Sequence, residues 1–188
     1  LIKGKSNCYG KRNGNAIYRN LFLMSCFLFI CRQIIRIGSA GAYVPELNLG
    51  DVVLEESAWS ESTFAHTQNG YDKDTIYPDP ELNAHILEAA KRNNITVKPV
   101  KVHSSDVFYT EPNVDGYKEI SAKHGCACVE MESFALLHNA NVLHKKATCM
   151  LTISDSMPKK EHATAAERQT SLQYDDRRLE LAGLRFDV

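Results

Sequence analysis

Hydrophobic and polar residues follow two different periods along the middle of the chain. The segments QIIRI (33–37), GDVVLEE (50–56) and ITVKPVKV (95–102) are rich in β-branched residues and predict strands, with Pro99 marking a sheet edge or a bulge. The longer apolar run KATCMLTISDS (146–156) is typical of a strand buried on both faces. Glycines and a serine directly after the first segment predict that this strand runs into a tight turn.

Helical periodicity appears between these strands. Asp79 and Pro80 predict a helix start, because Asp is a favoured N-cap and Pro suits the first turn. The segment CACVEMESFALLHNA (126–140) predicts a short strand that continues as a helix, and EHATAAERQTSL (161–172) predicts a further helix. Residues 60–78 show little periodicity and predict a long loop. The helix after Asp79 has one apolar face, formed by Leu82, Ile86, Ala89 and Ala90.

Strands that alternate with helices predict an α/β fold: a single domain with a central mixed β-sheet flanked by helices. The length of 188 residues suits one domain, which we place at 33–173, and the net charge of −1 gives no overall attraction to nucleic acid. The six cysteines include no C-x-x-C pair, which argues against a zinc finger. Free buried thiols are typical of a reducing compartment, so we expect a cytoplasmic protein.

Polar side chains cluster where three of the predicted strands end. In open α/β sheets, ligands bind beyond the carboxyl ends of the strands. The sequence therefore predicts a binding site where these ends meet. The three groups are Arg36 with Gly38, Ser39 and Gly41; Val129 with Glu130, Met131 and Glu132; and Ser154 with Asp155.

Each group has a functional and a purely structural interpretation. Arg36 and the glycine-rich segment after it would bind phosphate through guanidinium and backbone N–H donors, but a turn that needs glycine for positive φ explains the same residues. Glu130 and Glu132 would accept hydrogen bonds from vicinal sugar hydroxyls, or they would complement a helix macrodipole. Asp155 would serve as a half-buried general acid, or it would cap a helix together with Ser154.

Four motifs in order carry a resemblance to a known family. IIRIGSAGAY, VEMES, TISDS and AAERQTS together resemble the bacterial-type hexameric purine nucleoside phosphorylases, over residues 33–173. The resemblance implies the nucleoside phosphorylase fold, incomplete at its N-terminus, and an enzyme that splits purine (deoxy)ribonucleosides with phosphate into free base and (deoxy)ribose 1-phosphate. It implies no metal or organic cofactor, since inorganic phosphate is a co-substrate. The implied partners are the nucleoside, phosphate and further copies in a homo-hexamer, with no nucleic acid and no membrane.

The resemblance also implies a role for each matching residue. Arg36 and Ser39 would bind phosphate, and Glu132 would bind the ribose hydroxyls. Asp155 would protonate purine N7, with Arg168 orienting it. These roles suit an oxocarbenium-like transition state, because phosphate near the sugar and a protonated base both lower the barrier. The remaining substrate contacts would come from Gly41, Phe108, Val129, Glu130, Met131 and Ser154.

Related activities stay open at this point. They are a uridine phosphorylase, a methylthioadenosine nucleosidase, and a remnant without catalytic activity. Within the wider superfamily, Asp155 after a strand favours purine over uridine, and Arg168 favours the phosphorylases over the nucleosidases that use water. From the residues alone, Arg168 would equally pair with Glu161 or Glu167 on a solvated helix face.

The beginning of the chain departs from the family. Residues 1–45 hold seven Lys or Arg and no Asp or Glu, and the apolar run 21–31 is shorter than the roughly 20 residues of a membrane span. Where the family reads approximately G-M-G-M-P-S-I-G-I, residues 12–20 read RNGNAIYRN, and one coding of the family stretch, shifted by one nucleotide, gives all nine of these residues. We therefore expect residues 1–32 to be translated out of frame and residues 174–188 to be an atypical tail. An isolated chain of this kind is expected to fold poorly and to turn over little inosine.

Overall fold

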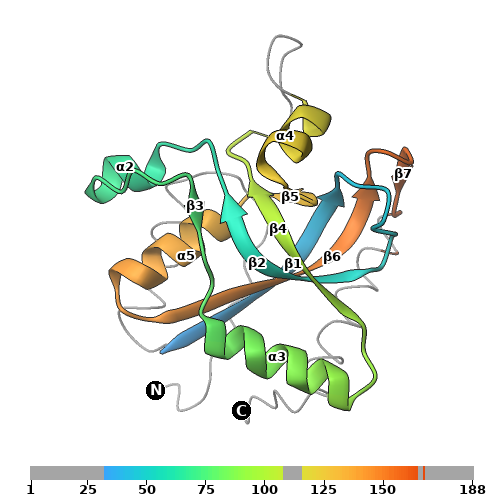
Figure 1. Cartoon of the computed structure of the whole chain (residues 1–188), viewed down its shortest axis with the longest axis horizontal. Coiled ribbons are helices and arrows are strands. Elements are labelled where there is room, and N and C mark those ends of the chain that lie inside the picture. Colours follow the sequence, from blue (N-terminus) through green and yellow to red (C-terminus); the bar gives the residue numbers. More distant parts are fainter. Residues whose placement is uncertain (1–31, 108–115, 165–166, 168–188) are drawn as a thin grey trace.

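One mixed sheet forms the centre of the protein (Figure 1), seen in a computed structural model that describes residues 32–107, 116–164 and 167. Its strands are β1 (Gln33–Ala42), β2 (Val52–Trp59), β3 (Thr75–Ile76), β4 (Val97–Ser104), β5 (Cys128–Glu130), β6 (Lys146–Ser156) and β7 (Glu161–His162). They lie in the order β3-β2-β4-β5-β1-β6-β7, and β2 also pairs with β6, so the sheet closes back on itself. β1 is parallel to β6 and antiparallel to β5, which confirms the predicted mixed sheet.

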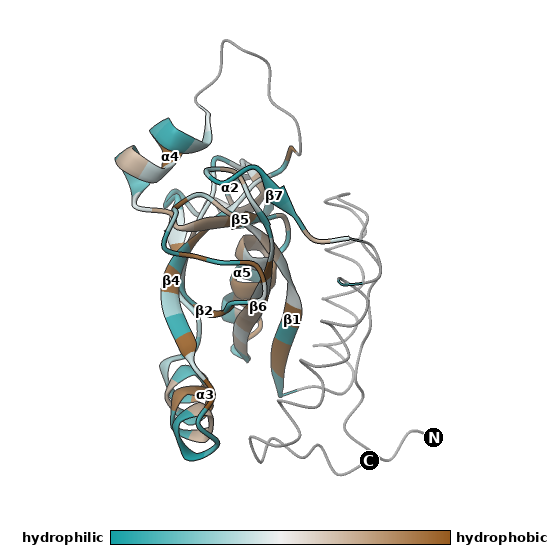
Figure 2. Ribbon diagram, turned by 90° about the vertical axis from the view of Figure 1, so that its right-hand side faces the viewer, coloured by the Kyte–Doolittle hydropathy of each residue, from teal (hydrophilic) through white to brown (hydrophobic). Residues whose placement is uncertain are grey.

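Helices flank this sheet, as the alternating pattern predicts. They are α2 (Phe64–Asn69), α3 (Pro80–Arg92), α4 (Tyr117–His124) and α5 (Ser133–Val142). In both views α2 and α4 lie at one end of the sheet and α3 lies at the opposite end (Figures 1 and 2). α5 is buried along nearly its whole length and is mostly apolar in Figure 2, whereas α3 presents both kinds of residue.

Two apolar clusters hold the sheet and α5 together. Burying one large aliphatic or aromatic side chain stabilises a fold by roughly 1.5–3 kcal/mol, so these clusters are the main favourable contribution to folding. The first cluster joins α5 to α2, β2, β3 and β6, and it consists of Ala58, Ala65, Ile76, Phe134, Leu136, Leu137, Ala140 and Ala147. The second lies within the curved sheet, and it consists of Ala40, Ala42, Leu47, Val53, Val102, Cys128, Cys149, Leu151 and Ile153.

Local sequence signals locate α3 and β6 correctly. Asp79 precedes α3 with extended backbone, and its Oδ1 accepts a hydrogen bond from the Leu82 amide at 2.9 Å. Pro80 is the first helical residue, and the four predicted apolar positions of this helix are all buried. β6 covers the predicted residues 146–156, and it is buried at most positions.

Three other predicted elements are wrong in part. The strand that begins at Gln33 continues to Ala42 instead of turning at its glycines. Residues 60–78 contain α2 and β3 rather than only a loop. Glu161 and His162 form β7 rather than the start of a helix, because they pair antiparallel with Ser156 and Asp155 of β6. A two-residue strand in such a local hairpin is too short to leave an alternating pattern in the sequence.

The three cysteines within the described part of the chain, Cys126, Cys128 and Cys149, are buried and free, as predicted. The other three lie outside the described residues. Residues 1–31, which hold the segment expected to be out of frame, and the tail 174–188 are likewise not described. Within the described ranges, no helix combines the length and the apolar character needed to cross a bilayer.

Replacing Asp79 with Ala should lower the free energy of unfolding by about 1 kcal/mol, because the Leu82 amide loses its side-chain acceptor. Asp79→Asn is the matched control, since an amide oxygen can accept the same bond, and it should cost less than about 0.5 kcal/mol. Chemical unfolding followed by fluorescence of Trp59, the single Trp of the sequence, measures both variants. Equal losses in the two variants would show that the cap is not the cause.

Candidate active site

The sheet brings together strands that hold the three predicted polar groups, but Arg36 lies in the first half of β1 rather than at its end. Gly41 of β1 lies opposite Val129 of β5 and opposite Asp155 of β6. The pairing of β1 with β6 shifts register between Ala40 and Gly41, and the extra residue is Ser154, so β6 carries a bulge at this point. A Cβ atom on Gly41 would lie 3.5 Å from Val129 Cγ1 and 3.9 Å from Asp155 Cβ. The strands β1, β5 and β6 are therefore neighbours at Gly41, as predicted.

Arg36 is the charged centre of this region. Its guanidinium forms an ion pair with Glu132, lies 3.4 Å from Glu130 Oε2, and donates a 3.4 Å hydrogen bond to Cys149 Sγ. The exposed fraction of the side chain is 21% for Arg36, 23% for Glu132 and only 1% for Glu130. Burial alone would lower the pKa of Arg36, but Cys149, Glu130 and Glu132 outweigh burial and raise this pKa, so the guanidinium stays charged.

Gly38 leaves the space that the Arg36 guanidinium occupies. A Cβ atom on Gly38 would lie 2.8 Å from Arg36 Cζ and 2.9 Å from its Nη2, which is closer than side-chain atoms normally approach. The described glycines with positive φ are Gly50, Gly70 and Gly125, so neither Gly38 nor Gly41 is required for a left-handed turn. The turn interpretation of this segment is wrong, and close approach is the reason for glycine at position 38.

Glu130 has a structural role at the start of α5. Its carboxylate accepts hydrogen bonds from the backbone N–H groups of Glu132 (2.8 Å) and Ser133 (3.0 Å) and from the Ser133 hydroxyl (2.7 Å). An anion at a helix N-terminus also complements the macrodipole, which confirms the structural interpretation for this residue. Glu132 differs, because its side chain points to Arg36 and remains partly exposed. Met131 lies between the two carboxylates and is also partly exposed.

Asp155 lies near the end of β6, and two of its hydrogen-bonding neighbours belong to the described part of the chain. The Ser154 hydroxyl donates to its Oδ2 at 2.6 Å, and His162 Nδ1 lies 3.1 Å from its Oδ1. β6 continues through Ser156, so the interpretation of Ser154 and Asp155 as a helix cap is wrong. His162 was not predicted from the sequence, because only the pairing of β7 with β6 brings it to Asp155. Ser39, the predicted phosphate ligand, lies on β1 opposite Thr152.

Phe108 and Arg168, the predicted base contact and the predicted partner of Asp155, lie outside the described residues. The alternative pairings of Arg168 lie outside them as well. The described part of the predicted site therefore consists of nine side chains or glycine positions: Arg36, Ser39, Gly41, Val129, Glu130, Met131, Glu132, Ser154 and Asp155.

A row of hydrogen-bonded side chains, which no sequence pattern predicts, lies next to Val129. The Tyr43 hydroxyl is 2.7 Å from His103 Nδ1, and His103 Nε2 is 2.7 Å from Glu61 Oε2. Burial raises the pKa of Tyr43, so its phenol stays protonated. Burial would also raise the pKa of Glu61, but hydrogen bonds, chiefly from His103, lower it overall. Val129 packs against the apolar cluster that contains Tyr43. The hydrogen-bonded row therefore supports Val129, the predicted contact of the base.

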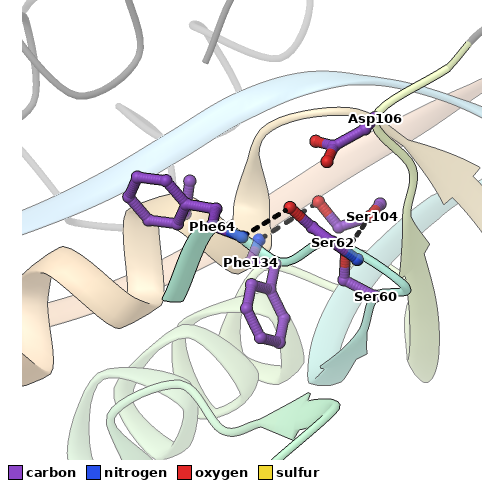
Figure 3. Close-up of a pocket in the computed structure, with 7 residues that line it drawn as sticks. Ser60, Ser62, Phe64, Ser104, Asp106 and Phe134 are labelled. Atoms are coloured by element: carbon purple, nitrogen blue, oxygen red, sulfur yellow. Dashed lines mark hydrogen bonds between the residues drawn. The ribbon is translucent and has the colours of Figure 1, made fainter. Parts of the chain in front are cut away.

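A shallow pocket lies near this hydrogen-bonded row, where β2 and β4 end beside the start of α5 (Figure 3). The Ser60 hydroxyl donates to the Ser104 carbonyl at 2.6 Å, and the Ser104 hydroxyl accepts from the Phe134 amide at 3.2 Å. These hydroxyls therefore support the local backbone and the first turn of α5. The pocket contains none of the predicted site residues, and its lining is Ser60, Ser62, Phe64, Ser104, Asp106, Phe134 and Ala135.

Comparison with known proteins agrees with this geometry. The chain belongs to the Phosphorylase superfamily, which it matches over residues 7–182. It is 33% identical over 156 residues to the DeoD-type purine nucleoside phosphorylase of Bacillus velezensis, covering 83% of this chain and 65% of that protein. Against the DeoD-type purine nucleoside phosphorylase of Mycoplasma genitalium it is 36% identical over 147 residues, covering 74% and 59%. The chain thus spans less than two thirds of the length of these curated relatives.

The fold is also that of a solved relative. The native structure of futalosine hydrolase of Helicobacter pylori superposes with a TM-score of 0.74 and 19% sequence identity, over 89% of this chain and 74% of that one. Similarity at this identity concerns the fold alone. Together with the curated relatives, it confirms the predicted nucleoside phosphorylase fold and the predicted resemblance to purine nucleoside phosphorylases.

Gly38→Ala should destabilise the protein by about 1–3 kcal/mol, because the new methyl group displaces a guanidinium that two carboxylates hold in place. Gly41→Ala is the control, since its Cβ would meet its nearest neighbours at ordinary contact distances of 3.5 Å and should cost less than about 1 kcal/mol. Denaturant midpoints of both variants test this difference. A Gly38→Ala protein as stable as Gly41→Ala would show that Arg36 moves freely.

Proposed function

We propose that the chain cleaves purine (deoxy)ribonucleosides by phosphorolysis, giving the free base and (deoxy)ribose 1-phosphate. One observation carries the proposal: Arg36 of β1 forms an ion pair with Glu132 at the start of α5, and β1 runs parallel to β6, on which Asp155 lies opposite Gly41. The relatives named purine nucleoside phosphorylase support the same chemistry. The proposal includes a homo-hexamer and a cytoplasmic location.

In this reaction one bond to the anomeric carbon replaces another. Asp155 donates a proton to purine N7, so that the base leaves with the electron pair of the C1′–N9 bond. A phosphate oxygen, held by Arg36 and Ser39, forms the new bond to C1′. Glu132 accepts hydrogen bonds from the ribose hydroxyls. Because the sugar carries positive charge in the transition state, the phosphate and the carboxylate both stabilise it more than they stabilise the bound substrate.

Four further residues would bind the substrate. Gly41 and Val129 would line the base pocket together with Phe108, and Met131 would pack against the sugar. Ser154 supports the acid, since its hydroxyl donates to Asp155 Oδ2. In its protonated form Asp155 carries the proton on one oxygen, and the second oxygen can keep an accepted hydrogen bond. Arg168 would orient this carboxyl group.

Hydrolysis is the second candidate, and the charge around Arg36 favours it. Two carboxylates, Glu130 and Glu132, already accompany the guanidinium. A phosphate dianion must compete with Glu132 for the same donors, whereas water needs no cation. The site of a nucleosidase would therefore require no rearrangement of this ion pair.

Inosine turnover by the purified chain is expected to be slow, but hypoxanthine should be released only when phosphate is present. Asp155→Asn should lower this rate about a hundredfold or more, because an amide cannot protonate N7. Glu88→Gln, on the exposed side of α3, is the control and should leave the rate unchanged. Released base and ribose 1-phosphate are measured by chromatography, with a full-length relative as the positive control.

The products distinguish the candidate functions. Free ribose formed at the same rate without phosphate would replace phosphorolysis with hydrolysis. Cleavage of uridine or methylthioadenosine in preference to inosine would change the substrate class. No base release from any of these substrates, beside an active full-length relative, would identify the chain as a remnant without catalytic activity.

A further inference from the structure

Glu55 is a fully buried carboxyl group at the centre of the sheet. Its residue is 0% exposed, whereas the next residue, Glu56, is exposed. The pairing of β2 with β4 shifts register between Glu55 and Ser57, and such a bulge re-aims the side chains around it. Polar residues of this length are almost never buried completely unless they are paired, so Glu55 requires an explanation.

The neighbours of Glu55 come from every element around it and include the charged centre of the candidate site. β2 pairs antiparallel with β6 through Leu54 and Met150, which brings Glu55 beside Cys149, the residue opposite Arg36 on β1. The carboxyl group of Glu55 is therefore within the influence of Arg36, Glu130, the Cys149 thiol and the Ser133 hydroxyl. On β4 the residue opposite is the apolar Val100, and from α3 the Asn83 amide donates to the Glu55 backbone carbonyl at 2.8 Å.

The donors near Glu55 are already used by other groups. The Ser133 hydroxyl donates to Glu130 Oε1 at 2.7 Å, and the Arg36 guanidinium is shared between Glu132, Glu130 and Cys149. Neither carboxyl oxygen of Glu55 has a hydrogen bond of normal geometry among the described residues, although the Ser133 hydroxyl and the Cys149 thiol lie near enough to oppose the rise in its pKa. A carboxylate without partners is costly to bury, so the neutral acid is the form that this environment favours.

The proton on Glu55 decides the charge of the whole group. Burial, followed by the charge of Glu130, raises the pKa of Glu55 to about 8, although Ser133, Arg36 and Cys149 oppose the rise. Below that pH, Arg36 is accompanied by the two carboxylates of Glu130 and Glu132. Above it, Glu55 adds a third negative charge on the buried side of the same guanidinium. Two carboxylates that share one cation cannot both ionise without cost.

We propose that Glu55 is a further residue of the anion site, and that its proton sets how strongly the Arg36 centre binds phosphate. The inference rests on the proposed function, because it takes phosphate as the anion that Arg36 receives. Protonated Glu55 leaves Arg36 able to attract the incoming dianion. Ionised Glu55 repels it and holds the guanidinium more strongly, so phosphate affinity falls as Glu55 loses its proton.

Glu55→Gln separates charge from shape, since the amide has nearly the same volume and cannot ionise. Titration calorimetry with inorganic phosphate, on the full chain, should give affinities within about twofold of each other at about pH 6.5. At about pH 9.5 the Gln variant should bind about tenfold more tightly than the unmodified chain. Ionisation of phosphate itself is the same in both proteins and cancels in this comparison.

The free energy of unfolding provides a second measurement that needs no phosphate. Between about pH 4.5 and about pH 8 the folded chain keeps a proton on Glu55 that the unfolded chain has released. The stability of the unmodified chain should therefore fall across this window relative to Glu55→Gln, and the gap should stay constant above it. Glu55→Met, which fills a similar volume without any titratable group, should behave as Glu55→Gln does and is available if the Gln variant folds poorly.

The results distinguish the role of Glu55 from the proposed phosphorolysis. Equal pH dependence of phosphate affinity in the unmodified chain and in both variants would overturn the role of Glu55 and leave phosphorolysis intact. Failure of all three proteins to bind phosphate at either pH would overturn both proposals. The expected difference in phosphate affinity, without cleavage of any purine nucleoside, would support the role of Glu55 and overturn phosphorolysis.

Discussion

The ion pair between Arg36 and the carboxylates that follow β5 is the interaction on which the rest of the site depends. One guanidinium on β1 contacts Glu130, Glu132 and the Cys149 thiol of β6. Glu130 in turn holds the first backbone amides of α5. This partly buried cation therefore ties two strands and a helix start to each other, and removing it would leave the buried Glu130 carboxylate without its cation, which typically costs several kcal/mol.

The fold was predictable where the signal is local. The Asp79 and Pro80 start of α3 and the long apolar run of β6 follow from residues that are neighbours in sequence. The misses have two causes. The continuation of β1 through its glycines depends on β5 and β6, which lie alongside it and are distant in sequence. β7 pairs with the neighbouring β6, but its two residues are too few to show a strand pattern.

The grouping of the candidate site residues was predictable from polar clusters in three predicted strands, whereas the roles given to them rest on the motif resemblance. Arg36, Glu132 and Asp155 stand in motifs, and the sheet brings their strands together. Glu55 stands in the segment LEES, where two adjacent glutamates resemble a solvated stretch of strand. Its burial follows from a bulge on β2 and from pairing on both sides of that strand. A side chain of this kind becomes visible only in three dimensions.

The balance of charge at Arg36 links the fold to the choice between phosphate and water as nucleophile. A helix that begins at Ser133 needs an anion near its first amides, and Glu130 supplies this anion. The same carboxylate reduces the positive potential that would attract phosphate, so the start of α5 is stabilised at a cost to anion affinity. A site in this fold can recover the affinity in two ways: it keeps neighbouring acids neutral, as burial does for Glu55, or it adds cations from elsewhere. Phosphorolysis requires at least one of these, whereas hydrolysis requires neither.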